Sequence, residues 1–232
     1  MRREKTTVSQ EDYLKAIWEI VQEEQVPISA RLAEDLGVTP PAVTAALKRM
    51  RRGGYLHVAR DGRIQLRRKG RNVAEHLVLR HRLAEKLLTE VLGLDWSKAH
   101  EEAERLEHGI SPEVESLLLK RFGADSSCPH GVPLFGGLAK LRKRNKAMRL
   151  SEVAAGDRVQ VLRVYEKDSQ FLEFLVARSL LPGAQLKIRK KEYDETMTLT
   201  VFAPAKRRGR TNSGIHLGKP ATSRIWVRRL PS

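Results

Sequence analysis

The sequence predicts a mainly α-helical protein that ends in a small β domain. Apolar residues recur at helical spacing over the first fifty residues, and an alternating segment around Asp61-Gly62 follows them. Beyond residue 151 the chain contains mostly short β-rich segments. The expected order is a winged helix-turn-helix domain (1–70), a helical domain (71–123), a basic linker (124–150) and a small β-barrel domain (151–232).

The first two helices have clear start and stop signals. Ser9 precedes the amphipathic segment EDYLKAIWEIVQEE, and acidic residues occupy its first turn. Pro27 ends this segment because proline cannot continue a helix. A short helix then fits Ser29–Leu36, and Gly37 is suited to end it.

A third helix and a β-hairpin complete the N-terminal pattern. Thr39 is a suitable N-cap, Pro40 fits the first helical position, and Gly53-Gly54 stops the helix. The segment YLHVARDGRIQLRRKG then alternates apolar and polar residues around Asp61-Gly62, a two-residue hairpin signal. A helix, a short turn, a second helix and a hairpin form a winged helix-turn-helix, which predicts DNA binding.

The helix that begins at Pro40 is the predicted recognition helix. Its first residues should lie at base edges, and the basic residues of its last turns and of the wing should lie near phosphates. A charge run often forms only a solvated face, but here it coincides with a DNA-binding motif. The predicted contacts are Thr39, Pro40, Pro41, Ala42, Thr44, Lys48, Arg49, Arg51, Arg52, Arg60 and Arg63.

The rest of the chain divides into a helical part and a β-rich part. Periodic apolar residues predict helices over 71–92, 97–108 and 111–122. The glycine- and proline-containing joint SSCPHGVPLFGG and the basic run KLRKRNKAMR follow. The segments VQVLRVY, AQLKIRKK, MTLTVFA and SRIWVRRL then surround one short helix near 169–179, which predicts the β-barrel.

Charge is distributed unevenly along the 232 residues, whose formal net charge is +16. Residues 1–70 carry a net +5, residues 71–123 a net −2 and the remainder a net +13. This excess predicts an anionic partner, although the run at 206–210 fits a solvated loop slightly better than a contact. A single cysteine, the absence of an apolar secretion signal and the absence of a long apolar run predict a cytoplasmic protein without a membrane partner.

Imidazoles and carboxylates gather on one predicted helical face of the middle domain. His100, Glu104, Glu107 and His108 fall within about 100° of one another if 97–108 is one α-helix. His81 and Glu85 lie one turn apart on the preceding helix, in line with its apolar stripe. Taken singly, Glu104, Glu107 and His108 fit a solvated helix surface, and His81 fits an ordinary core histidine. As a set on two helices, they favour a divalent metal site.

These features together resemble the diphtheria toxin repressor family of iron- and manganese-dependent regulators. The resemblance covers residues 9 to about 122 and includes the winged motif, and the joint and barrel resemble those of three-domain members, whose barrel is src-homology-3-like (FeoA-like). The matching segments are Asp12-Tyr13-Leu14, Arg80-His81-Arg82-Leu83-Ala84-Glu85 and Glu104-x-x-Glu107-His108.

The resemblance implies a metal site and favours manganese over iron. Iron-type members have methionine at the position of Asp12 and cysteine at that of Glu104, whereas two hard oxygen donors here suit Mn²⁺. Binuclear manganese regulators have a second carboxylate one turn after Asp12, but this chain has Lys15, which puts a close metal pair in doubt. The implied ligands are Asp12, His81, Glu104, Glu107 and His108.

The resemblance also implies a second metal site that would fix the barrel to the helical domain. Three-domain manganese members use a glutamate that matches Glu85, a Cys-x-His in the joint and an acid from the barrel, for which Asp168 and Glu166 are both candidates. An ancillary ligand of iron-type members matches His100, so two ligand sets compete for Glu85. The residues of this second set are Glu85, His100, Cys128, His130 and Asp168.

The expected protein is therefore a homodimeric repressor of metal-transport genes that binds a palindromic double-stranded operator when Mn²⁺, or alternatively Fe²⁺, is bound. A metal that joins Asp12 to the middle domain would set the spacing of the two recognition helices. Three rival interpretations are a metal-dependent hydrolase, a metal-independent winged-helix regulator and an architectural DNA binder. A hydrolase is disfavoured because the chain has no His-Glu-x-x-His motif and no evident nucleophile.

Overall fold

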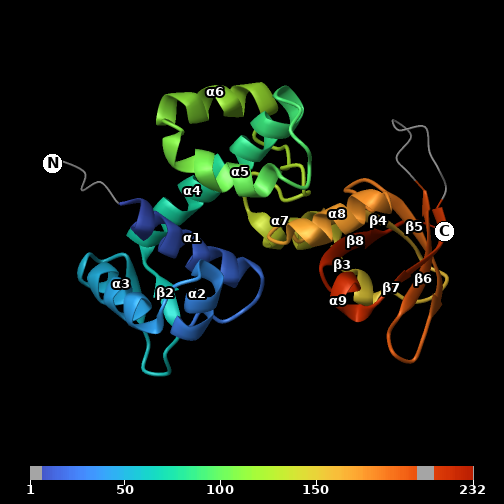
Figure 1. Cartoon of the computed structure of the whole chain (residues 1–232), viewed down its shortest axis with the longest axis horizontal. Helices are drawn as coiled ribbons and strands as arrows, with labels where there is room; N and C mark the ends of the chain where they lie inside the picture. Colours follow the sequence, from blue (N-terminus) through green and yellow to red (C-terminus); the bar gives the residue numbers. More distant parts are fainter. Residues whose placement is uncertain (1–6, 203–211, 232) are drawn as a thin grey trace. The chain divides into compact units, whose positions relative to one another are not determined.

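The computed structural model describes residues 7–202 and 212–231, and the basic run at 206–210 lies outside the described residues (Figure 1). The chain forms two compact units. The first contains the residues up to 81 together with 106–112, and the second contains 82–105 together with the residues from 113 onward. The predicted fold class is confirmed: helices dominate up to residue 145, and a six-stranded sheet follows.

The first unit contains the winged helix-turn-helix. Its elements are α1 (Val8–Gln22), α2 (Ser29–Leu36), α3 (Pro40–Arg52), β1 (Leu56–Val58), β2 (Ile64–Leu66) and the beginning of α4 (Arg68–Lys86). A capping box between Thr7 and Gln10 starts α1 earlier than Ser9 would. Gly37, with φ +61°, ends α2 in the left-handed conformation that favours glycine.

One apolar core holds α1, α2, α3 and the hairpin together. Leu14 and Ile17 of α1, Leu32 of α2 and Met50 of α3 are fully or almost fully buried in it. The start of α4 approaches the hairpin closely, since a Cβ on Gly70 would lie 2.2 Å from the carbonyl oxygen of Tyr55. The position of α3 therefore depends on α1, because both helices contribute to the same core.

The expected helix over 97–108 is shorter in the structure. Here α5 (Ala99–Leu106) ends, and a 3₁₀ turn, η2 (Glu107–Gly109), continues the chain before α6 (Pro112–Phe122). Because a 3₁₀ turn has three residues per turn, Glu107 and His108 do not continue the face of α5. Similarly, α4 passes into a π-helical turn, η1 (Leu87–Val91), instead of continuing as α-helix.

The linker contains a helix that the sequence analysis did not predict. In α7 (Gly137–Asn145), Leu138 and Leu141 pack against Trp226, and Gly136 precedes the helix in a left-handed conformation. Arg142, Lys143 and Arg144 remain exposed. This helix has only one short apolar face among many basic residues, so its amphipathic pattern is weak in the sequence.

The β domain is an antiparallel sheet in the order β3-β8-β4-β5-β6-β7. One face packs against α8 (Ser169–Ala177), which contributes Leu172 and Leu175 to the core, and α9 (Lys219–Thr222) is a single turn. The strand β7 and the short β3 were not predicted. The strands are β3 (Met148–Arg149), β4 (Arg158–Val164), β5 (Gln185–Lys191), β6 (Met197–Phe202), β7 (Asn212–Leu217) and β8 (Ile225–Arg229).

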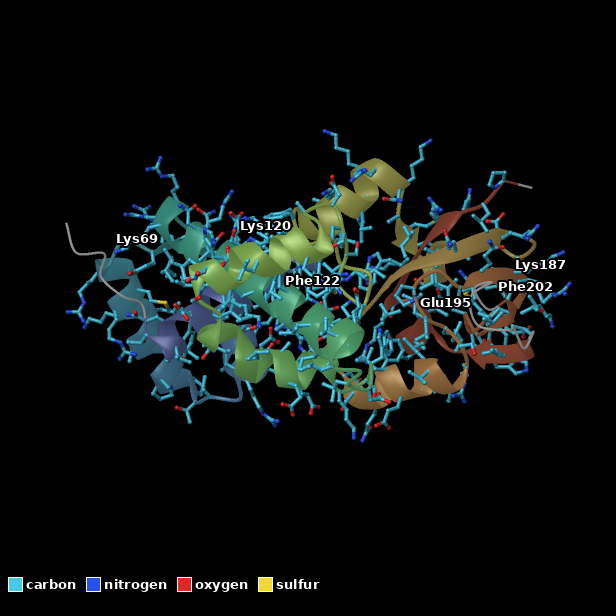
Figure 2. The ribbon with its side chains drawn as sticks, turned by 90° about the horizontal axis from the view of Figure 1, so that it is seen from above. Lys69, Lys120, Phe122, Lys187, Glu195 and Phe202 are labelled. Atoms are coloured by element: carbon cyan, nitrogen blue, oxygen red, sulfur yellow. The ribbon has the colours of Figure 1, made fainter. Side chains whose placement is uncertain are left out.

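The second unit also links its helices to its sheet through the joint at 124–136. Lys86 donates to the carbonyl of Ser127, and its ammonium lies 5.0 Å from the ring centroid of Phe122. Phe122, which Figure 2 labels, is the last residue of α6. The backbone N–H of Val164 in β4 donates to the carbonyl of His130 over 3.0 Å. Residues of α4, the joint and β4 are therefore held close together.

Candidate metal centres

The first candidate centre joins the start of α1 to the turn η2 within the first unit. One ligand atom each from Asp12, Glu107 and His108 lies within 4.8 Å of the other two. His108 Nε2 is 2.9 Å from Asp12 Oδ1 and 3.8 Å from Glu107 Oε1. Two carboxylate oxygens and one imidazole nitrogen form a suitable donor set for a divalent cation.

A second pair of side chains contacts Glu107 in the same cluster. Lys15 Nζ lies 2.9 Å from Glu107 Oε1 and 2.7 Å from Oε2. His81 Nδ1 lies 2.6 Å from the same Oε2 and 3.2 Å from the lysine nitrogen. All three side chains are at most 5% exposed, so this is a buried and charged arrangement.

Glu11, which the sequence analysis missed, contacts the other nitrogen of His108. Its Oε2 lies 2.9 Å from His108 Nδ1. A carboxylate at Nδ1 favours the tautomer that has its proton there, which leaves Nε2 free to bind a metal. The signal for Glu11 was its position beside Asp12 in the first turn of an amphipathic helix, which also fits a plain helix-start residue.

The electrostatics of Asp12 also fit a cation. Burial raises the pKa of its carboxyl above the ordinary value, and the nearby His108 opposes that shift only in part. The charged form of Asp12 is thus insufficiently stabilised by the protein groups around it. A bound divalent ion would supply the missing positive charge and favour the carboxylate.

Four of the five residues predicted for the first site come together in the first unit. Ligand atoms of Asp12, Glu107 and His108 lie close together, and His81 contacts Glu107. Glu104 belongs to the second unit, where its Oε1 lies 3.6 Å from His100 Nε2 and its side chain is 43% exposed. Its participation in the first site stays a prediction.

The second candidate centre is buried in the second unit. Ligand atoms of Glu85, Cys128 and His130 lie within 4.8 Å of one another. Glu85 Oε1 is 3.1 Å from His130 Nδ1 and 3.3 Å from His100 Nδ1. The two ligand sets that compete for Glu85 in the sequence analysis therefore meet at the same oxygen.

Of the two barrel carboxylates proposed as ligands, Glu166 interacts with the residues of this centre, whereas Asp168 has other partners. Asp168 caps α8 by accepting the N–H of Phe171, and it pairs with Arg224 over 2.8 Å. Glu166 instead interacts electrostatically with Glu85, His100 and His130. Burial raises the pKa of Glu166, but Arg163 and the two histidines outweigh that effect and keep it low. Glu166 is the candidate that the structure brings to the cluster.

The protonation states of the second centre depend on Glu85. Burial, together with the charges of Glu85 and Glu166, raises the pKa of the Cys128 thiol well above its usual value. Burial lowers the pKa of His130, but Glu85, Glu166 and the carbonyl of Trp96 together outweigh that effect, so the net shift is upward. Without a metal ion the sulfur is therefore a thiol, and a metal that binds it would displace the proton.

The residues predicted to contact DNA are all exposed in the winged helix-turn-helix. Along α3, Val43, Leu47 and Met50 are buried, whereas every residue predicted to contact DNA is exposed. In the wing, Arg63 Nε lies 2.6 Å from Asp61 Oδ2, and Arg60 is exposed beside it. This arrangement leaves the α3 face accessible, as readout of DNA requires.

Three family models cover almost all of the chain. The N-terminal DNA-binding domain of the iron-dependent repressors matches residues 5–64, and their metal-binding and dimerisation domain matches residues 67–136. A FeoA domain matches residues 148–229. The diphtheria toxin repressor of Corynebacterium efficiens is 34% identical over 187 residues, which is 77% of this chain and 81% of that protein. This chain belongs to the diphtheria toxin repressor family.

Other members of the family agree with this placement. The iron-dependent repressor IdeR of Mycobacterium bovis is 39% identical over 158 residues, covering 66% of this chain and 69% of that protein. A manganese-dependent transcriptional repressor in complex with manganese superposes with a TM-score of 0.82 at 28% identity, covering 95% and 100% of the two chains. The apo form of the manganese-activated repressor ScaR gives 0.75 at 25% identity, covering 94% and 100%.

Family membership establishes the general function. The chain is a metal-dependent, DNA-binding transcriptional regulator whose middle domain binds metal and dimerises. The family consists of transcriptional repressors, which argues against the hydrolase interpretation. Within the described residues, every helix is too short or too polar to cross a membrane.

Proposed function

We propose that this protein is a cytoplasmic repressor that Mn²⁺ activates for binding to a palindromic operator of metal-transport genes. The observation that carries the proposal is the cluster of Asp12, Glu107 and His108, which brings two oxygen donors and one imidazole together. Asp12 belongs to the DNA-binding domain, whereas Glu107 and His108 belong to the segment matched by the metal-binding domain. One ion in this cluster would bind both domains.

The donor chemistry supports manganese as the activating ion. In the first cluster the candidate ligands that the structure describes offer oxygen and nitrogen but no sulfur, and Glu104 would add a further oxygen. Hard oxygen donors suit Mn²⁺, whereas softer donors favour later transition metals. Fe²⁺ is the alternative, because the relatives include both iron-dependent and manganese-dependent repressors.

Metal would act on DNA binding through α1. This helix shares its core with α3, so an ion that fixes α1 relative to η2 also restrains the recognition helix. In a two-fold dimer, the recognition helices must be about 34 Å apart, or a multiple of that distance, to enter successive major grooves. The ion would favour the DNA-competent arrangement because it binds that arrangement more tightly.

The second cluster would hold a structural ion. Glu85 lies on α4, Cys128 and His130 lie in the joint, and Glu166 follows β4. An ion bound by these side chains would connect the helices of the second unit to its sheet. A thiolate, imidazole and carboxylate set suits Zn²⁺ as well as Mn²⁺, so we expect this centre to be less selective than the first.

The proposal is tested with Asp12→Ala. Operators are selected from a random duplex library with Mn²⁺ present, and binding is then measured by fluorescence anisotropy with Mn²⁺, Fe²⁺, Zn²⁺ or a chelator. Wild-type affinity should rise with Mn²⁺ by a factor in the range of about 5 to 150 that is typical of coupled sites, and Asp12→Ala should lose that rise. Asp194→Ala removes an exposed carboxylate of a turn and serves as the matched control.

Different outcomes contradict different parts of the proposal. Operator binding that the chelator leaves unchanged in the wild type would support a metal-independent regulator. Equal affinity for operator and scrambled DNA would support an architectural binder. Activation by Fe²⁺ at lower free concentration than by Mn²⁺ would replace manganese with iron as the signal.

A further inference from the structure

Lys15 is an unusual component of a metal cluster because it is itself a cation. Its side chain is 4% exposed, and its ammonium contacts both oxygens of the fully buried Glu107. A buried ammonium is costly unless a carboxylate compensates it, and removal of either partner leaves an uncompensated charge. Lys15 and Glu107 are therefore energetically dependent on each other.

The two oxygens of Glu107 face different neighbours. Oε1 is the oxygen near the first centre, 3.8 Å from His108 Nε2. Oε2 is 2.6 Å from His81 Nδ1 and is also the closer of the two to Lys15, at 2.7 Å. Lys15 thus donates to both oxygens of Glu107, while His108 lies on the Oε1 side and His81 on the Oε2 side. A cation that binds Oε1 together with Asp12 and His108 would replace the contact of Lys15 with that oxygen and leave its shorter contact with Oε2.

Among the groups that belong to the first unit, the charges of the cluster match one divalent ion. Glu11, Asp12 and Glu107 contribute three negative charges when ionised, and Lys15 contributes one positive charge. The remaining charge of −2 is neutralised by a single divalent cation. A second divalent ion would produce an excess of positive charge around a buried carboxylate, which the low local dielectric makes costly.

We propose that Lys15 is a tethered cation that takes the place of a second metal ion on Glu107. The ammonium holds α1 to η2 through Oε2 when no metal is bound, and the single divalent ion binds on the Oε1 side with Asp12 and His108. This inference rests on the proposed metal site at Asp12. It gives Lys15 two roles, because it limits the cluster to one ion and stabilises the metal-free form.

The limit of one ion is tested by counting metal in three proteins. Purified wild type, Lys15→Arg and Lys15→Glu are equilibrated with Mn²⁺ by dialysis, and the bound manganese per chain is measured by elemental analysis. Lys15→Arg retains the cation and should bind as many ions as the wild type. Lys15→Glu replaces the ammonium with an oxygen donor and should bind one more ion per chain. An unchanged count in Lys15→Glu would overturn the inference.

The stabilising role is tested without metal. Lys15→Met keeps the length of the side chain but removes its charge, so the melting temperature of the metal-free protein should fall by roughly 5 °C or more. Lys143→Met, at an exposed position of α7, is the matched control and should change it by about 1 °C or less. Mn²⁺ should recover part of the loss in Lys15→Met. A variant that folds only with Mn²⁺ would support the same conclusion.

The outcomes separate this inference from the proposed function. If Asp12→Ala binds as many Mn²⁺ ions as the wild type with equal affinity, the metal site itself is wrong, whatever Lys15 does. If Asp12→Ala loses an ion but Lys15→Met is as stable as Lys143→Met without metal, the metal site stands and the role of Lys15 is wrong.

Discussion

The two candidate metal centres differ in accessibility and in chemistry. In the first, the side chains of Asp12 and His108 are 38% and 16% exposed, and the donors are oxygen and nitrogen. In the second, the side chains of Glu85 and His130 are 1% and 0% exposed, and a thiol is present. We therefore expect an ion to exchange more readily at the first centre, through its exposed Asp12 side, than at the second centre.

This difference indicates a division of roles. A sensor must equilibrate with the free metal concentration, which requires an accessible site whose occupancy changes a conformational equilibrium. A site closed by packing instead adds its binding free energy to the stability of the folded unit. We expect the first centre to report the metal concentration and the second to maintain the structure of the second unit.

The largest expected effect comes from Gly131→Ala, which acts on the second centre alone. Gly131 has φ +90°, and an added Cβ would lie 1.9 Å from the carbonyl oxygen of Leu162. Because this oxygen belongs to the backbone and cannot rotate away as a side chain could, we expect a loss of about 3 kcal/mol or more in the stability of the second unit. Hydrogen exchange measured by mass spectrometry should increase in β4 and in the joint.

Gly156→Ala is the matched control for that experiment. Gly156 has a similar φ of +93°, but nothing lies within 4 Å of an added Cβ. Its substitution should cost only the backbone strain, about 1–2 kcal/mol. If Gly131→Ala increases exchange no more than Gly156→Ala does, the joint is not fixed to β4, and the closed character of the second centre is wrong.

Cys128→Ser tests whether the two centres differ in metal preference. Oxygen in place of sulfur makes the donor harder, so affinity for Zn²⁺ should fall by about tenfold or more and affinity for Mn²⁺ should fall less. Competition with a chromophoric chelator measures both constants. Metal-stimulated DNA binding should persist, because Cys128 is not part of the first centre. Loss of that stimulation would contradict the division of roles.

The sequence predicted the architecture because each element carried its own local signals. Gly37 ends α2 and Pro40 starts α3, as expected. Asp61 and Gly62 lie in the hairpin turn, but the loop has three residues, 60–62, and not the two that the sequence predicts, because residues 59 and 63 pair across it. By contrast, α7 and the short strand β3 have little local signal, and their stability comes from contacts such as those of Leu138 and Leu141 with Trp226. Such elements form because of tertiary packing, and a local sequence pattern does not report tertiary contacts.

The metal ligands were predicted as residue types, but their arrangement was not. The sequence placed His100, Glu104, Glu107 and His108 on one helical face, whereas the 3₁₀ turn at Glu107 separates the last two from the helix. The contact between Lys15 and Glu107 spans 92 residues of sequence, and no periodicity within one helix reports a contact of that range. Glu11 was missed because its partner His108 is equally remote.

Glu11→Gln tests the orientation of His108 in the first centre. The amide is a weaker acceptor for the Nδ1 proton of His108, so the ring is less firmly held with Nε2 toward the metal. Loss of such an outer partner typically lowers metal affinity by about 10- to 100-fold, and we expect the lower end because the amide oxygen remains. Isothermal titration with Mn²⁺ measures the affinity, with Glu34→Gln at an exposed position of α2 as control.

The first centre should be the only one of the two that responds to Glu11→Gln. If Mn²⁺ affinity at the second centre falls equally, Glu11 acts through general stability and not through His108. If neither affinity changes, His108 is oriented by the remaining ligands, and the contact of Glu11 is incidental to metal binding.

The smallest expected effect distinguishes the two acidic residues of the barrel. Asp168→Ala removes the N-cap of α8 and its pair with Arg224, so the stability of the second unit should fall by about 1 kcal/mol. Affinity for metal at the second centre should not change, because Asp168 has other partners. Glu166→Gln should instead lower that affinity, since Glu166 interacts with Glu85 and both histidines. Urea denaturation and chelator competition measure the two quantities. The reverse result would make Asp168 the barrel ligand, and the N-cap contact would then have to break when metal binds.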